Sequence, residues 1–157
     1  MTDDNFRKYE PFFGKWRISK ELGKGSFGKV FEIYWDDSLG NRKVSALKII
    51  HIPSDEALRI QMDAQPNMEA VRNYFLKQVN RIKEEVRILQ TCRDNRNIVQ
   101  YEEDDIRETK GKIGWDIMIR MELLYPLNMY FSRKEATQYD VVLMWRDVAN
   151  ALIFCEE

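Results

Sequence analysis

The sequence predicts an α+β fold in which strands come first, one long helix follows them, and a further strand comes after the helix. Residues 16–22, 29–35 and 43–50 are rich in aromatic and β-branched side chains, which favour strands. Between residues 71 and 89, apolar side chains recur every three or four positions, which indicates a helix with one buried side. Residues 113–124 form another strand-like apolar run. The patterns therefore predict a sheet packed against one long helix.

Composition limits the classes of protein to which the chain can belong. Its 157 residues suit a single domain, and 44% apolar residues permit a core. A net charge of −1 gives no general attraction to nucleic acid or to anionic membranes. No apolar run approaches the ~18 residues of a membrane span. Cys92 and Cys155 lack metal-ligand spacing, and His51 is the only histidine, expected as a surface or packing residue. We therefore expect a cytoplasmic protein with reduced thiols.

A glycine-rich stretch at residues 22–30 is the first candidate for a functional site. Gly23, Gly25 and Gly28, with Val30 two residues on, form a loop whose backbone N–H groups can approach phosphate oxygens. The G-x-G-x-x-G pattern alone is weak, because dinucleotide-binding folds share it. In those folds a helix follows the glycines, whereas here a strand follows them. A dinucleotide-dependent oxidoreductase is therefore disfavoured, and a glycine-rich hairpin is predicted.

Further motifs come after the glycines in order. They are Ala46-Leu47-Lys48 on the strand 43–50, Glu85 on the helix 81–90, Asn97-Ile98-Val99, and the strand-like run 117–124. With the glycine hairpin, they resemble the small lobe of protein kinases, most of all bacterial serine/threonine kinases of the eukaryotic type. Ser45 departs mildly from the V-A-I-K pattern, where valine is usual. The interval from Lys48 to Glu85 is longer than is common in kinases.

The resemblance implies a five-stranded antiparallel sheet with one long helix, followed by the first helices of a helical large lobe. Residues 1–15 would be a lead that packs Phe12 and Phe13 against the domain, and residues 16–124 the nucleotide-binding lobe. Residues 125–157 would leave the hinge and form the first large-lobe helices. The catalytic-loop H-R-D-x-x-x-x-N and the D-F-G do not occur, so the chain is expected to be a kinase truncated before them.

The resemblance also implies roles for individual residues. Lys48 would hold the α- and β-phosphates of ATP while paired with Glu85, and these two are the catalytic candidates. The nucleotide would be bound by Leu22, Gly23, Lys24, Gly25, Ser26, Phe27, Gly28, Val30, Ala46, Lys48, Met121, Glu122 and Leu124. In this set Met121 is the gatekeeper, and Glu122 and Leu124 are the hinge. Taken singly, the apolar members equally suit an ordinary sheet core, and Glu85 equally suits a solvated helix surface.

The expected function is transfer of the γ-phosphate of ATP to serine or threonine of a protein substrate, with this chain as the ATP-binding part. Mg²⁺ is expected as a cofactor whose ligands lie in the absent motifs, so no metal ligand is assigned here. The alternative is a catalytically inactive, truncated kinase-like scaffold or nucleotide-binding module. The acidic run 102–105 is expected to be a solvated strand end rather than a metal site. Helical patterns at 128–134 and 140–157 would leave an apolar stripe uncovered.

Overall fold

The structure is a computed structural model that describes residues 4–25, 28–65, 67–133 and 135–156. Its elements are α1 (Asp4–Arg7), β1 (Arg17–Gly25), β2 (Gly28–Asp36), β3 (Arg42–Ile52), α2 (Asp55–Ala64), α3 (Met68–Thr91), β4 (Tyr101–Glu108), β5 (Trp115–Met121), α4 (Leu127–Arg133) and α5 (Gln138–Glu156). The five strands form one antiparallel sheet in the order β1-β2-β3-β5-β4. The predicted α+β class and the five-stranded antiparallel sheet are confirmed.

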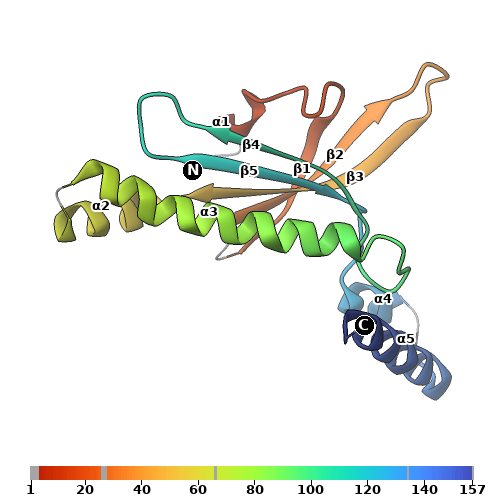
Figure 1. Ribbon diagram of the computed structural model, residues 1–157. Coiled ribbons are helices and arrows are strands. Elements are labelled where there is room, and N and C mark those ends of the chain that lie inside the picture. Colours follow the sequence, from red (N-terminus) through yellow and green to blue (C-terminus); the bar gives the residue numbers. More distant parts are fainter. Residues whose placement is uncertain (1–3, 26–27, 66, 134, 157) are drawn as a thin grey trace.

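One face of the sheet is covered by the long helix α3 (Figure 1). Its buried side chains, Val71, Phe75, Val79 and Val86, are members of the predicted apolar stripe. They pack against Ile50, Ile52, Tyr101, Trp115, Ile117 and Ile119 of the sheet. Because side chains alternate across a strand, the even-numbered residues of β3 point to this face. The position of α3 on the sheet is therefore set by a continuous apolar contact rather than by local helix propensity.

The other face of the sheet is covered by the N-terminal segment that precedes β1. Phe12 is 1% exposed, and Phe6 and Trp16 are buried beside it. They form a second cluster with Ile18, Phe31, Ile33, Leu47, Ile49 and Met118. The predicted packing of Phe12 and Phe13 against the domain is confirmed, since Phe13 packs against the same cluster.

The helices α2 and α3 both begin at side-chain caps. Ser54 Oγ accepts a hydrogen bond of 3.2 Å from the backbone N–H of Ala57 at the start of α2. Asn67 Oδ1 accepts from Glu69 and Ala70 at the start of α3. Such caps satisfy backbone N–H groups that have no partner within the helix.

The fourth strand begins later than the resemblance implies. Asn97-Ile98-Val99 was expected to open it, whereas β4 begins at Tyr101. The acidic run 102–105 lies inside this strand and not at a solvated strand end, so that expectation was wrong. Arg120 of β5 explains the difference: its guanidinium pairs with Glu102 and lies 3.2 Å from a Glu103 oxygen. β4 is an edge strand, where charges on the open side remain hydrated.

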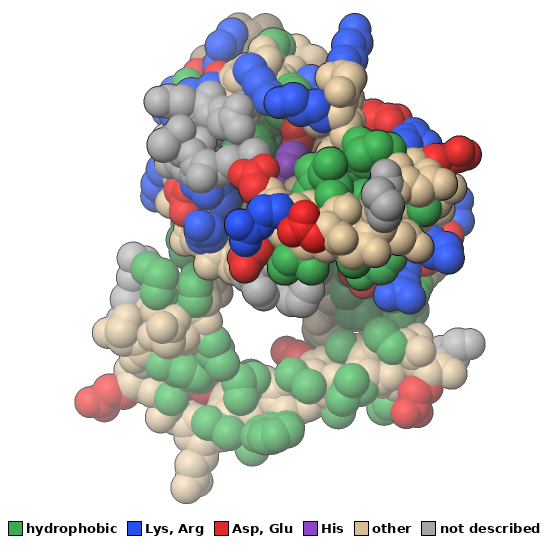
Figure 2. Space-filling view, turned by 90° about the vertical axis from the view of Figure 1, so that its left-hand side faces the viewer, with side chains coloured by type: hydrophobic (Ala, Val, Ile, Leu, Met, Phe, Trp, Pro, Cys, Tyr) green, Lys and Arg blue, Asp and Glu red, His purple; other side chains and the backbone are tan. Residues whose placement is uncertain are grey.

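The C-terminal helices α4 and α5 lie away from the sheet, at the lower end of the molecule in Figure 1. Figure 2 shows hydrophobic side chains gathered on this lower part. No residue described in α5 is buried, and Trp145 is 66% and Leu152 63% exposed. The predicted exposure of the apolar stripe is therefore confirmed. Among the residues that the structure describes, no helix combines the length and the apolar character needed to cross a bilayer.

Candidate functional site

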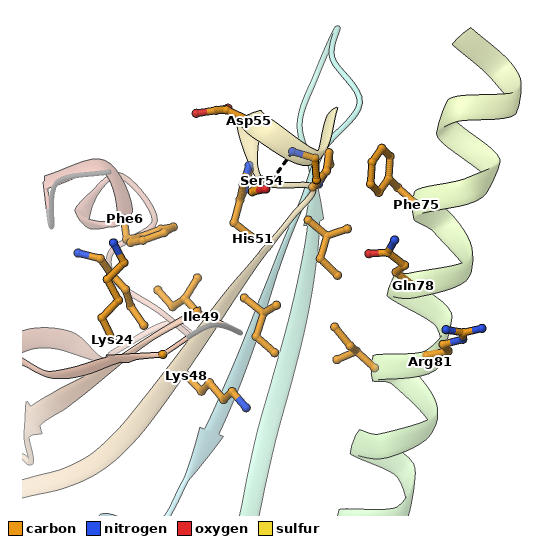
Figure 3. Close-up of a pocket in the computed structure, with 18 of the residues that line it drawn as sticks. Phe6, Lys24, Lys48, Ile49, His51, Ser54, Asp55, Phe75, Gln78 and Arg81 are labelled. Carbon is orange, nitrogen blue, oxygen red and sulfur yellow. Dashed lines mark hydrogen bonds between the residues drawn. The ribbon is translucent and has the colours of Figure 1, made fainter. Parts of the chain in front are cut away.

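A cavity of about 790 Å³ lies between the glycine hairpin, the end of β3 and the helices α2 and α3 (Figure 3). The β1–β2 hairpin contributes Lys24, Gly25, Gly28 and Lys29 to its walls. β3 contributes residues 48–52, and α3 contributes Phe75, Gln78, Arg81, Ile82 and Glu85. Phe6 of the N-terminal segment closes the wall nearest the hairpin. The cavity thus collects both basic and apolar groups from segments that are distant in the sequence.

Lys48 is placed in this cavity by the register of the sheet. It lies opposite Val30 on β2 and Ile119 on β5, and so it shares the face that α3 covers. Figure 3 shows its side chain extending into the space between β3 and α3. Within the described part of the chain, Lys48 has no ion pair with any carboxylate at 4.0 Å or less. Its ammonium group is therefore available to an anionic ligand.

Glu85 lines the same cavity as Lys48 but is solvent-exposed. The neighbouring Glu84 is turned away and pairs at 2.5 Å with Arg87. This difference supports the predicted helix register, in which Glu85 and not Glu84 faces β3. The direct pairing of Lys48 with Glu85 stays a prediction, because the structure brings both residues to one cavity without an ion pair between them.

The glycine hairpin is held in an extended form by strand pairing, with Gly25 opposite Gly28. Gly28 has a φ of +135° and packs directly on β3, where an added Cβ would lie 2.1 Å from the carbonyl oxygen of Ile49. Only glycine fits this position. Lys29, next to it, pairs at 2.7 Å with Glu21 across the hairpin. The predicted site residues Ser26 and Phe27 lie outside the described residues.

The residues predicted to surround adenine lie on the same sheet face but outside this cavity. Ala46 is paired with Met121, and Val30 with Gly23, at the end of the sheet away from α2. Ala46 is 5% exposed, whereas Leu22 is 44% and Leu124 58% exposed. These positions therefore form a surface beside the cavity that is buried at Ala46 and open to solvent at Leu22 and Leu124.

The predicted hinge is fixed by polar contacts that the sequence did not show. The backbone N–H of Glu122 donates to the carbonyl of Gln100 at 3.0 Å, and its carboxylate accepts from the N–H of Gln100 at 2.7 Å. The Ser45 hydroxyl lies 2.6 Å from the carbonyl oxygen of Met121. Ser45, the departure from the V-A-I-K pattern, is 1% exposed, so its hydroxyl needs this acceptor.

Comparison with known proteins assigns the chain to no family. No protein-family model matches it, and no curated protein matches it.

Sequence reasoning missed a buried polar network at the far end of the cavity. Asp116 on β5 is 4% exposed, and its Oδ1 lies 2.6 Å from Nδ1 of His51 on β3. The phenol of Tyr9 donates to its other oxygen. Because an ionised carboxylate only accepts, Nδ1 of His51 carries the hydrogen. His51 lies within β3, lines the cavity and bonds a buried carboxylate, so it is a packing residue with a specific polar partner.

The charges around Asp116 set the protonation states of this network. Burial works to raise the pKa of Asp116, but the hydrogen bonds from His51 and Tyr9 outweigh it and hold the pKa below its ordinary value. Burial and the hydrogen bond to Asp116 raise the pKa of Tyr9 to about 12. Arg107, whose guanidinium lies 5.0 Å from the Tyr9 ring centre, opposes that rise. At neutral pH the Asp116 carboxylate therefore accepts hydrogen bonds from the neutral phenol of Tyr9 and from the Nδ1–H of His51.

We expect Tyr9→Phe to lower the free energy of unfolding by about 1.5–3 kcal/mol, the range for a hydrogen bond to a charged group. The folded-state pKa of Tyr9 is raised, so its contribution is fully present below the ordinary value of 10.0. It is lost as pH rises through about 12. Urea unfolding of both proteins across this alkaline range checks the prediction, because the difference between them should shrink there.

Tyr74→Phe is the matched control for this measurement. Tyr74 is 47% exposed on α3, and its hydroxyl has no hydrogen-bond partner among the described residues. Its removal should change stability by no more than ~0.5 kcal/mol, as is usual for a surface substitution. Equal effects of the two substitutions at neutral pH would contradict the role given to Tyr9.

Proposed function

We propose that this chain is the nucleotide-binding lobe of a protein kinase that phosphorylates serine or threonine. One observation carries the proposal: the glycine hairpin, the strand lysine and the helix glutamate line a single cavity. These three elements come from residues 23–28, 48 and 85, and no local feature of the sequence requires them to meet. In a kinase they serve to cover, hold and position the phosphates of ATP.

The sheet geometry supports specific roles for the residues of this site. Lys48 has a half-buried stem and an ammonium group free to contact the α- and β-phosphates of ATP. Gly25 and Gly28 bring backbone to the cavity wall, and backbone N–H groups are donors suited to phosphate oxygens. Ala46, Val30 and Met121 present an apolar surface to the adenine ring from the same face of the sheet. Glu85 would orient Lys48 once the helix moves closer to β3.

Magnesium has no matching site in the part of the chain that the structure describes. No group of three or more His, Cys, Asp or Glu side chains gathers there in a way that could hold a metal ion. We therefore assign no step to Mg²⁺ in this chain. The proposed contribution of these residues is binding and orientation of the nucleotide, and the proton transfer of a kinase reaction is assigned to none of them.

We expect the chain to bind ATP weakly and Lys48→Met to weaken that binding by about 10- to 100-fold. This range corresponds to the loss of ~1.5–3 kcal/mol for hydrogen bonds to a charged group. Isothermal titration calorimetry of the whole 157-residue chain with ATP measures both dissociation constants.

Lys43→Met is the matched control for the nucleotide titration. Lys43 lies on β3 five residues before Lys48, so it projects from the opposite face of the same strand. The Lys43→Met substitution removes an equal charge at a position that does not line the cavity. Two results would overturn the proposal: no saturable ATP binding by the parent chain, or equal weakening by the two substitutions.

The alternative, an inactive kinase-like scaffold, shares the nucleotide site and lacks only the phosphate transfer that a kinase carries out once ATP is bound. The exposed apolar side chains of α5 favour it, because such a surface is typical of protein contacts. A phosphate-transfer assay with labelled ATP and a generic protein substrate separates the two. We expect no transfer by this chain, since H-R-D-x-x-x-x-N and D-F-G are absent from its sequence.

A further inference from the structure

The cavity extends around the end of β3 to both faces of the sheet. The pairing of β2 with β3 ends at Lys29 and Ile49, whereas β3 continues to Ile52. Ile50 and Ile52 pack on the α3 side, and Ile49 packs on the side of the N-terminal segment. All three line the cavity. The cavity therefore has a part on each face, and Lys48 shares the α3 face with Ile50 and Ile52.

The part on the other face, which we call the outer chamber, is lined by Phe6, Lys24, Ile49 and His51. Figure 3 shows Phe6, Lys24 and His51 on one side of β3, opposite the side chains of α3. Phe6 and Ile49 are buried, so they give the chamber packed apolar walls. Lys24 is exposed, and no described carboxylate pairs with it. The outer chamber thus combines an apolar wall with a cation at its rim.

His51 supplies a second polar group to the outer chamber. Its Nδ1 donates to the buried carboxylate of Asp116, and this bond fixes both the tautomer and the direction of the ring. Among the described residues no hydrogen bond reaches the other ring nitrogen, Nε2, although the side chain is partly buried. Nε2 accepts a hydrogen bond when it is bare and donates one when it is protonated. A ligand in the cavity can therefore bind at Nε2.

The charges around His51 suit an anion at this nitrogen. The titratable and charged side chains near it come from several segments and are Lys8, Tyr9, Lys24, Asp55, Arg107 and Asp116. The ionised Asp116 balances the charge of a protonated imidazole, and Tyr9 donates to Asp116 rather than to the ring. Figure 3 shows the carboxylate of Asp55 pointing away from the imidazole. An approaching anion therefore meets Lys24 and an imidazole whose added proton is already balanced.

We propose that the outer chamber binds a carboxylate that carries an apolar chain. The carboxylate accepts hydrogen bonds from Nε2 of His51 and from the ammonium group of Lys24, and the chain lies against Phe6 and Ile49. Nε2 takes one proton from solvent as the anion binds, so one positive and one negative charge enter together. Hydrogen bonds between two charged groups are about twice as strong as those between neutral groups. The site lies on the sheet face opposite Lys48, which separates it from the proposed phosphate contacts.

Nuclear magnetic resonance of His51 tests this directly, because it is the only histidine of the chain. The whole chain with nitrogen-15-labelled histidine is titrated with octanoate, at a pH at which Nε2 of the free chain carries no hydrogen. We expect the Nε2 signal to move saturably to that of a protonated nitrogen, while Nδ1 keeps its hydrogen. Methyl octanoate has the same chain without the charge, and we expect it to leave Nε2 bare. Octanoate that binds to the exposed side chains of α5 does not move this signal.

Matched variants show whether Lys24 takes part. Lys24→Met should weaken octanoate binding by about 2- to 5-fold, as is usual for an exposed ion pair. Lys20→Met is the control, because Lys20 lies on the same strand, pairs with Glu32 at 3.4 Å and does not line the cavity. We expect Lys20→Met and Lys48→Met to leave octanoate binding unchanged, so the result does not depend on the proposed function.

Three results would overturn the inference. The first is an Nε2 signal that stays bare at the highest octanoate concentration. The second is an equal response to methyl octanoate, which would remove the role given to the charge. The third is equal weakening by Lys24→Met and Lys20→Met, which would mean that octanoate responds to the overall charge of the chain and not to the outer chamber.

Discussion

Gly28→Ala is expected to disrupt the glycine hairpin and to lower the free energy of unfolding by about 2–6 kcal/mol. One part of the loss, ~1–3 kcal/mol, comes from a backbone conformation that only glycine adopts without strain. Another ~1–3 kcal/mol comes from overpacking, because the new methyl group would lie 2.1 Å from the carbonyl oxygen of Ile49. Urea unfolding followed by tryptophan fluorescence measures the change.

Gly25→Ala is the matched control, because the same methyl group at that position meets nothing within 4 Å and the φ of Gly25 is not positive. We expect its stability to lie within ~1 kcal/mol of the parent chain. The two glycines face each other across the hairpin, so they share strand pairing and differ in contact with β3. Similar stabilities for both variants would mean that the hairpin does not rest on β3 as the structure has it.

Local patterns in the sequence were sufficient to predict most of the secondary structure. The spacing of Val71, Phe75, Val79 and Val86 identified α3. This signal is local, because a helix repeats every 3.6 residues. The meeting of hairpin, lysine strand and long helix was expected from resemblance, and the structure places all three at one cavity.

Contacts between distant residues were not predictable in this way. Asp116 lies two residues before the buried Met118 in an apolar strand, so both side chains point to the same face of the sheet. This spacing indicates a buried charge. Its partners Tyr9 and His51 are 107 and 65 residues away, and nothing local points to them. The acidic residues of β4 were misjudged for the same reason, because their partner Arg120 lies on another strand. Long-range pairing of charges depends on sheet order, which the sequence of one strand does not contain.

The exposed apolar side of α5 is expected to make the chain self-associate, and Trp145→Glu combined with Leu152→Glu is expected to abolish the association. Trp145 is 66% and Leu152 63% exposed, and both follow Val141 on one helical side. Each such side chain contributes about 1.5–3 kcal/mol when fully buried, so losing two weakens association by ~10²–10⁴-fold. Sedimentation equilibrium over a range of concentrations measures this change in the dissociation constant.

Thermal unfolding of the same double variant separates association from folding. In the monomer these two side chains are largely exposed, so their replacement should leave the stability of the sheet unchanged at concentrations where the parent chain is monomeric. If the double variant unfolded at a much lower temperature under those conditions, α5 would be packed against its own sheet in solution. If the parent chain stayed monomeric at all concentrations, the apolar side would be too small to drive association. Association lost together with unchanged monomer stability would identify α5 as a surface that a second copy covers.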